Sequence, residues 1–317
     1  MQYKKYIKEI LPIDLITLGY ILITAFYIIF GAAKLHDVTS HLFWRINFLG
    51  IIIVLIYLNT IFKNKTIEFF RNFYVLGFLA YFYPETDSLN NLFFFDLDPY
   101  IANLELTIFG SHPSILFSEY IPWKWFNELM NFGYFSYYPM ILILCISLYI
   151  RNREKFTFSI FVICMSFFMY YIIFILFPVA GPQFYLSPPY NQLSDGYVFQ
   201  HLVKLIQEFG ERPTAAFPSS HVGITCIVVY LAFRFQPKLL KWYIPLAIIL
   251  CLSTVYLKAH YAIDVIAGFF SVPTMYWISS RTYAVLTHGL SQEYRIHALY
   301  ERFVTSLSYV YSKNFKK

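Results

Sequence analysis

The sequence predicts an all-α protein, a polytopic bundle of about eight transmembrane helices. The 317 residues are 58% hydrophobic and 22% aromatic, and only 13% are charged, whereas a soluble domain carries roughly 25% charged residues. The mean hydropathy is +0.55. Apolar stretches close to the ~20 residues that cross the hydrocarbon layer as a helix recur along the chain. The protein is therefore expected to reside in a bilayer.

The predicted spans follow one another with short connections, apart from two long loops. They cover residues 12–33, 42–62, 67–84, 127–149, 156–178, 219–236, 242–259 and 261–280. Lysines precede the first span as in a signal peptide, but this apolar run is longer than a typical signal sequence. We therefore expect the first span to be an uncleaved helix.

The basic residues define the orientation. With a cytoplasmic N-terminus, 18 of the 24 Lys and Arg residues fall on the cytoplasmic side, as the positive-inside rule requires. The long loops 85–126 and 180–218 then lie on the opposite face. The expected location is a bacterial inner membrane with these loops in the periplasm. No nucleic-acid-binding motif accompanies the positive charge, so membrane lipids are the expected partners.

The first polar cluster precedes the sixth span. It runs from Arg212 through Ser219 and Ser220 to His221. Pro218 and the two serines indicate a helix start, where free N–H groups and the positive end of the helix dipole attract anions. Ser219, Ser220 and Arg212 are therefore candidates for binding phosphate.

The second polar cluster begins the eighth span, at the same membrane face. His260 and Asp264 are four residues apart and share one side of a helix. A carboxylate that accepts one ring N–H leaves the other nitrogen free to attack phosphorus. His221 is then a candidate general acid and base.

Each histidine taken singly is better explained as a capping or interfacial residue. Their occurrence at one face, together with Arg212 and Asp264, favours a phosphate site. Asp96 and Asp98 in the first long loop raise the alternative of a divalent-metal site, but an outer loop has other reasons to carry carboxylates. We expect neither a metal nor another cofactor.

These motifs resemble the type 2 phosphatidic acid phosphatase superfamily. Pro218-Ser219-Ser220-His221 is similar to its P-S-x-H signature, and His260-x3-Asp264 is similar to the end of its S-R-x5-H-x3-D signature. Two departures stand out. Seven residues, not six, separate Lys204 from Arg212-Pro213, and Thr254 stands where the third signature has arginine.

The resemblance implies a catalytic core of six helices, here residues 67–283, preceded by two additional spans in residues 1–66. Residues 284–317 would form a basic, amphipathic cytoplasmic tail. The resemblance also implies His260 as nucleophile, Asp264 as its orienting partner and His221 as general acid, and Lys204 would join the phosphate-binding residues. Residues 177–182 and the loop 85–126 look similar to the branch that contains inositol phosphorylceramide synthases.

The implied activity is removal or transfer of a phosphate-containing group from a lipid phosphate or phospholipid, through a phosphohistidine. Water as acceptor gives a phosphatase, and a lipid alcohol gives a transferase such as an inositol phosphorylceramide synthase. A lipid transporter or scramblase is the non-enzymatic alternative, and haloperoxidase-like oxidation is another enzymatic one. The sequence does not define the lipid or the oligomeric state.

Overall fold

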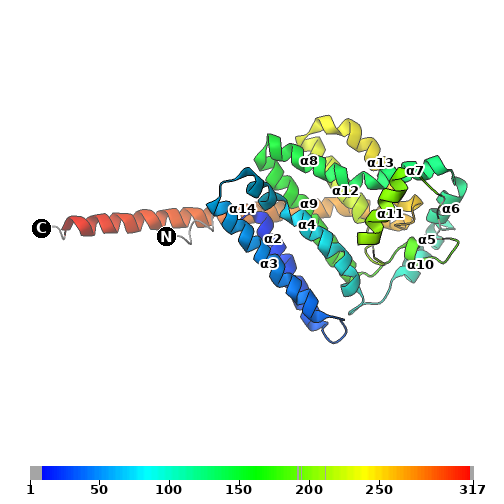
Figure 1. The fold of residues 1–317 in the computed structure, drawn as a ribbon, viewed down its shortest axis with the longest axis horizontal. Coiled ribbons are helices and arrows are strands. Elements are labelled where there is room, and N and C mark those ends of the chain that lie inside the picture. The colour runs from blue at the N-terminus through cyan, green and yellow to red at the C-terminus, as the bar shows by residue number, and fades with distance from the viewer. Residues whose placement is uncertain (1–8, 191–192, 194, 211, 315–317) are drawn as a thin grey trace.

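The computed structural model contains helices and no strands within the residues it describes, 9–190, 193, 195–210 and 212–314; for 290–314 it describes the backbone alone (Figure 1). In chain order the helices are α2 (Pro12–Phe30), α3 (Val38–Ile61), α4 (Lys65–Asn90), α5 (Asp98–Phe109), α6 (Pro113–Tyr120), α7 (Lys124–Phe135), α8 (Tyr137–Arg151), α9 (Arg153–Leu176), α10 (Pro182–Tyr185), α11 (Val198–Gly210), α12 (Ser220–Phe235), the 3-10 turn η1 (Pro237–Leu239), α13 (Leu240–Tyr256) and α14 (Ala262–Asn314).

The predicted membrane bundle is confirmed. Within the described part of the chain, six helical segments are long and apolar enough to cross a membrane: Pro12–Phe30, Val38–Ile61, Lys124–Arg151, Arg153–Leu176, Pro237–Tyr256 and Ala262–Gly289. The third and sixth predicted spans correspond to α4 and α12. The 16 residues of α12 are apolar but extend only about 24 Å, and α4 carries charged residues near both of its ends.

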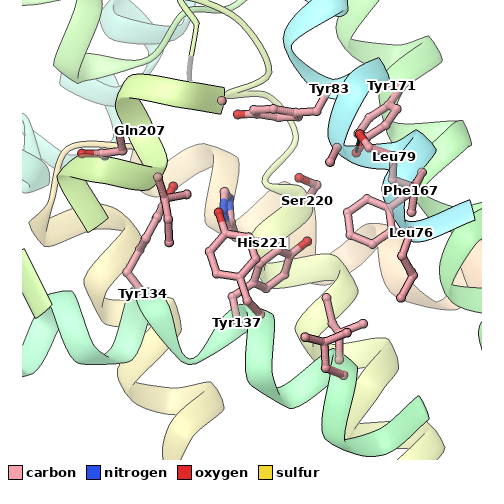
Figure 2. A pocket seen from close by; sticks show the side chains of 16 residues that line it. Leu76, Leu79, Tyr83, Tyr134, Tyr137, Phe167, Tyr171, Gln207, Ser220 and His221 are labelled. Atoms are coloured by element: carbon pink, nitrogen blue, oxygen red, sulfur yellow. Dashed lines mark hydrogen bonds between the residues drawn. The ribbon is translucent and has the colours of Figure 1, made fainter. Parts of the chain in front are cut away.

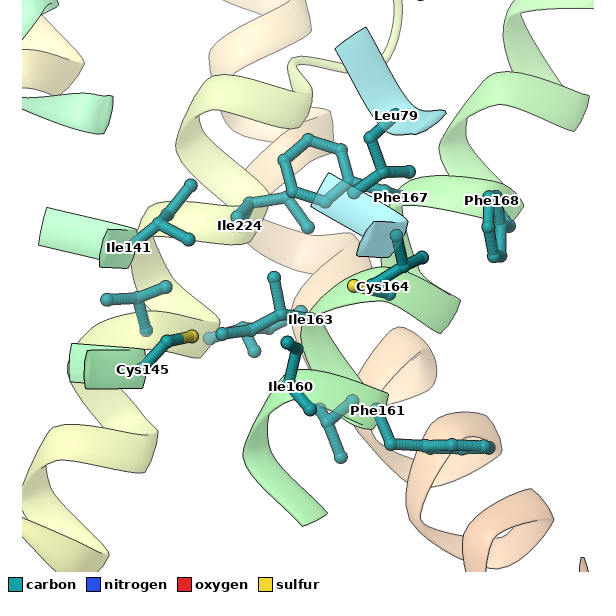
Figure 3. Packing of buried hydrophobic residues seen from close by; sticks show 14 of the residues in the cluster. Leu79, Ile141, Cys145, Ile160, Phe161, Ile163, Cys164, Phe167, Phe168 and Ile224 are labelled. Carbon is teal, nitrogen blue, oxygen red and sulfur yellow. The ribbon is translucent and has the colours of Figure 1, made fainter. Parts of the chain in front are cut away.

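The core is centred on α9, which packs against α2, α4, α8, α12 and α14. Figure 3 shows Ile163 and Phe167 of α9 among Cys145 of α8, Leu79 of α4 and Ile224 of α12. These side chains are buried among other protein atoms. Since lipid tails are as apolar as this core, close packing, and not the hydrophobic effect, has to hold the helices together.

Buried ion pairs attach the two N-terminal helices to α4. Nη1 of Arg71 donates to Oδ1 of Asp14 on α2 at 2.8 Å, and Nη2 of Arg45 on α3 donates to Oε2 of Glu85 at 2.7 Å. An unpaired charge in the hydrocarbon layer costs roughly 3 kcal/mol or more. These pairs therefore favour one arrangement of α2 and α3 on the remaining bundle.

The two long loops are partly helical. The first contains α5 and α6 and begins only after α4, which ends at Asn90 and not near residue 84 as predicted. The second contains α10 and α11. At the other end, α14 continues through residue 284, where we expected a separate tail, and projects beyond the bundle (Figure 1). The amphipathic pattern expected for the tail falls largely on residues 290–317, whose side chains lie outside the described part.

Candidate active site

The structure brings His221 and His260 into contact. His221 lies in the first turn of α12, and His260 lies in the turn between α13 and α14. Nδ1 of His221 is 3.2 Å from Nε2 of His260, and both side chains are buried. The sequence places these rings 39 residues apart, so the helix arrangement creates the pair.

A backbone carbonyl orients His260. Its Nδ1 lies 2.8 Å from the carbonyl oxygen of Ala216, which can only accept a hydrogen bond, so Nδ1 carries the proton. Nε2 then holds a lone pair directed at His221. The oxygen Oδ2 of Asp264 is 3.6 Å from the same Nδ1, beyond hydrogen-bonding distance. Asp264 is therefore an electrostatic neighbour of His260, and Ala216 is its hydrogen-bond acceptor.

Asp264 also organises the backbone around the pair. Its Oδ2 accepts the N–H of Tyr261 at 2.8 Å, and its own carbonyl accepts the N–H of Ser219 at 2.9 Å. Oδ1 has no hydrogen-bond partner among the described residues. The starts of α12 and α14 are thus joined directly, next to the two imidazoles.

The start of α12 retains part of the predicted anion site. Ser219 is the N-cap, and its hydroxyl accepts the N–H of Val222. Because the Ser219 N–H donates to Asp264, it is not free for a phosphate oxygen as the sequence suggested. The N–H groups of Ser220 and His221 have no acceptor in the described part of the chain. They remain at the positive end of the helix dipole.

Two glycines allow α12 and α14 to cross this closely. A Cβ atom on Gly268 would collide with the carbonyl oxygen of Ser219, and one on Gly223 would collide with the hydroxyl of Tyr170 and reach 3.3 Å from the Gly268 carbonyl. Small residues let helix backbones approach in a membrane. The contact between the histidines therefore depends on Gly223 and Gly268.

Two tyrosines that no sequence motif indicated pack against the His221 ring. The ring centroids of Tyr134 and Tyr137 lie 4.8 Å and 4.7 Å from that of His221. They flank Ser136, where α7 gives way to α8. Nothing in the sequence separates these tyrosines from the other aromatic residues of this span, so only the fold identifies them.

The predicted cationic residues lie at the periphery. Arg212 is exposed and lies close to Asp87 of α4, and Lys204 is on the exposed side of α11. Both cations are thus exposed, whereas the two imidazoles are buried. Thr254, in the position of the missing arginine, is buried and donates its hydroxyl to the Cys251 carbonyl, while its own carbonyl accepts the His260 N–H.

A cavity of about 340 Å³ lies beside His221 (Figure 2). Ser220 and His221 at the start of α12 line it, together with residues of α4, α7, α8, α9 and α11, including the polar Gln207. Most wall residues are apolar or tyrosine: Leu76, Leu79, Ala80, Tyr83, Tyr134, Tyr137, Tyr138, Ile141, Leu142, Phe167, Tyr171 and Ile206. The site therefore joins a polar, anion-attracting end to an apolar chamber inside the bundle.

The metal alternative raised by Asp96 and Asp98 does not match the geometry. Both oxygens of Asp98 already accept hydrogen bonds, from the N–H groups of Ala180 and Gly181 and from the Tyr261 hydroxyl. Within the described residues, no three His, Cys, Asp or Glu side chains gather as metal ligands would.

Paired imidazoles beside a helix start, next to a largely apolar chamber, are what a phosphatase-like site in a membrane protein requires. Comparison with known families agrees with this class, because the profile of the PAP2 superfamily matches residues 100–278. The chain belongs to the PAP2 superfamily. No curated protein and no solved structure matches it, so the narrower likeness to inositol phosphorylceramide synthases is not confirmed.

Proposed function

We propose that the protein transfers the phosphoryl group of a lipid phosphate to His260 and then to an acceptor. The observation that carries the proposal is the orientation of His260: Nδ1 is bonded to the Ala216 carbonyl at 2.8 Å, which leaves Nε2 as the nucleophile. Membership of the PAP2 superfamily supports a membrane phosphatase-like activity. The particular histidine and the lipid are part of our proposal.

In the first half of the reaction, Nε2 of His260 attacks phosphorus and the bond between phosphorus and the lipid oxygen breaks. His221 as imidazolium, favoured by the bound phosphate's negative charge, gives its proton to the leaving oxygen. The Ser220 and His221 N–H groups stabilise the negative oxygens. In the second half, neutral His221 takes a proton from water or an alcohol, whose oxygen attacks phosphorus; the bond between phosphorus and Nε2 breaks, and Nε2 of His260 regains its lone pair.

The resting contact between the rings must open during this cycle. With Nδ1 of His221 only 3.2 Å from Nε2 of His260, no phosphorus atom fits between them. The His221 ring therefore has to move relative to Tyr134 and Tyr137 when the lipid binds. The 340 Å³ cavity, which His221 lines, provides the space for this movement. It is common for catalytic groups to reach their working geometry only in the substrate complex.

The cavity supports a lipid as the substrate. Its walls are mostly apolar or tyrosine, and Ser220 and His221, whose N–H groups are at the proposed phosphate position, also line it. The hydroxyl of Tyr137 is buried and has no hydrogen-bond partner among the described residues, which costs roughly 1–3 kcal/mol. We propose that this hydroxyl bonds an oxygen of the lipid close to its phosphate.

We also propose that Arg212 and Lys204, which are exposed, bind the phosphate of the substrate. Both are exposed on the segment that leads into α12, and the cavity lining includes Ile206, Gln207 and Gly210 of the same segment. From the positive-inside pattern we also propose that the site faces the periplasm of a bacterial inner membrane.

The test is phosphate release from a radiolabelled lipid phosphate, with protein purified in detergent or nanodiscs. His260→Ala should abolish turnover and the acid-labile, alkali-stable phosphoprotein expected of a phosphohistidine. The control is His36→Ala, since His36 is exposed in the connection between α2 and α3. Turnover at the wild-type rate by His260→Ala would exclude His260 as the nucleophile.

The acceptor is identified in the same assay. Inorganic phosphate released in water marks a phosphatase, whereas a labelled lipid product that requires an added alcohol, for example ceramide or diacylglycerol with a phosphatidylinositol donor, marks a transferase. Lipid movement across vesicles that persists in His260→Ala, with no chemical product from the wild type, would instead identify a scramblase.

A further inference from the structure

Helix α5 carries two buried carboxylates outside the catalytic motifs. Asp98 and Glu105 are each 0% exposed, and they lie with buried Ala102 on the same face of a helix whose other residues are largely exposed. Buried carboxylates are expensive unless hydrogen bonds satisfy them. Their partners therefore indicate what this helix does.

Asp98 binds the segment before α10 and the residue after the nucleophile. Oδ1 accepts the N–H of Gly181 at 2.9 Å and the hydroxyl of Tyr261 at 2.8 Å, and Oδ2 accepts the N–H of Ala180. Tyr261 follows His260 directly and is fully buried. One carboxylate thus connects two chain segments that are about 80 residues apart in sequence.

The segment held by Asp98 also supports the other side of His260. The Val179 carbonyl accepts the Ala216 N–H at 3.0 Å, and the Ala216 carbonyl accepts Nδ1 of His260 at 2.8 Å. Gly181 has a φ of +94° and presses against the Ala259 carbonyl, where a Cβ would approach to 2.8 Å. Movement of residues 179–181 would therefore shift the His260 ring.

Glu105 acts at the start of α14. Its Oε1 accepts the N–H of Ala262 at 2.7 Å, one of the N–H groups that a helix start leaves without an internal partner. Its Oε2 is 3.0 Å from Nδ1 of His112. A carboxylate at this end also favours the helix dipole, so Glu105 fixes where α14 begins, two residues after His260.

We propose that Asp98 and Glu105 are positioning residues for His260: together they clamp the backbone on both sides of the nucleophile and keep its Nε2 aimed at the phosphate. This inference rests on the proposed function of His260. Burial raises the pKa of Asp98 to about 6 despite its hydrogen bonds. The cost of burying this charge offsets part of what the three hydrogen bonds contribute to stability.

The first test compares Asp98→Asn with Asp96→Asn. An asparagine has one acceptor oxygen, so at least one donor loses its partner, whereas Asp96 is exposed two residues away and its variant can still cap the Asp98 N–H. We expect Asp98→Asn to lower kcat on the order of 10- to 100-fold with KM and the melting temperature close to wild type. Asp96→Asn should match the wild type.

The second test separates positioning from folding. Tyr261→Phe removes one donor to Asp98 and should also lower kcat; combined with Asp98→Asn it should lower kcat by less than the product of the two single effects, because both variants disrupt one contact. Glu105→Gln keeps an acceptor for Ala262 and should retain most activity, whereas Glu105→Leu should not. Wild-type kcat in Asp98→Asn and Tyr261→Phe, or equal losses in the two Glu105 variants, would overturn the proposal.

A readout independent of turnover keeps this inference distinct from the proposed function. In protein labelled with ¹⁵N-histidine, the signals assigned by their loss in His260→Ala report the tautomer of that ring. Asp98→Asn should shift them away from the Nδ1–H form that the Ala216 contact selects. Unchanged signals would refute the positioning role, even for an active enzyme; changed signals would uphold it even if His260 were not the nucleophile.

Discussion

Substitution of Gly268 tests whether the crossing of α12 and α14 sets the catalytic geometry. A Cβ built on Gly268 lies 3.2 Å from both the carbonyl carbon and the Cβ of Ser219, and closer still to its carbonyl oxygen, whereas ordinary contacts begin near 3.4 Å. No flexible side chain can move aside, because most of this contact is with backbone. Gly268→Ala must therefore displace one helix start from the other.

The displacement is resisted by hydrogen bonds that hold Ser219. Its N–H donates to the Asp264 carbonyl at 2.9 Å, and its carbonyl accepts the Gly223 N–H at 3.0 Å. Overpacking of this kind typically costs about 1–3 kcal/mol. A misplacement of about 1 Å between reacting groups can cost on the order of 100-fold in rate, so we expect Gly268→Ala to lose turnover far more than stability.

The assay is kcat with a lipid phosphate, together with thermal unfolding in the same detergent. The matched control is Gly77→Ala in α4, since a Cβ there meets nothing within 4 Å; alanine should leave turnover unchanged and stabilise the helix by up to about 1 kcal/mol. If Gly268→Ala turned over like Gly77→Ala, the close crossing would not set the separation of the histidines, and the reasoning would fail.

Three further predictions concern the cavity, the peripheral cation and pH. Tyr137→Phe removes an unsatisfied buried hydroxyl, so the lipid-free protein should gain about 1–3 kcal/mol of stability while KM for the lipid rises; an unchanged KM would mean that Tyr137 does not contact the substrate. Arg212→Ala should lower kcat/KM about 10- to 100-fold through loss of a charged hydrogen bond, and wild-type kcat/KM would remove Arg212 from the phosphate site. Because burial raises the pKa of Asp98 from 3.8 to about 6, the folded state binds this proton more tightly; the Asp98 contribution to the free energy of unfolding should fall by on the order of 3 kcal/mol between about pH 4 and pH 6. Melting curves of wild type and Asp98→Asn that change in parallel with pH would contradict this.

The sequence was sufficient for the parts of the protein that periodicity and local spacing encode. Apolar length predicted the membrane bundle, and the motifs around His221 and His260 selected two residues that the fold does bring together. Pro218 and the serines correctly marked the start of α12. The weaker span predictions were α4, which is charged near its ends, and α12, which has only 16 residues.

The surroundings of the histidines could not be predicted because they depend on contacts without a local pattern. The hydrogen-bond acceptor of His260 is the backbone carbonyl of Ala216, and any residue type offers a carbonyl. No local sequence pattern distinguishes Tyr134 and Tyr137 from the other tyrosines of this aromatic-rich chain. Asp98 reaches Tyr261 across 163 residues, so its role becomes visible only when α5 is folded against the start of α14.

The contact between the imidazoles bears on which ligands can enter the site of the substrate-free protein. While Nδ1 of His221 stays 3.2 Å from Nε2 of His260, the proposed nucleophile is covered on that side by its partner. Under the proposed mechanism, binding of a lipid tail in the apolar chamber supplies the free energy that separates the rings. The protein would then discriminate against free phosphate before any bond forms, because free phosphate has no apolar tail whose binding could separate the two rings.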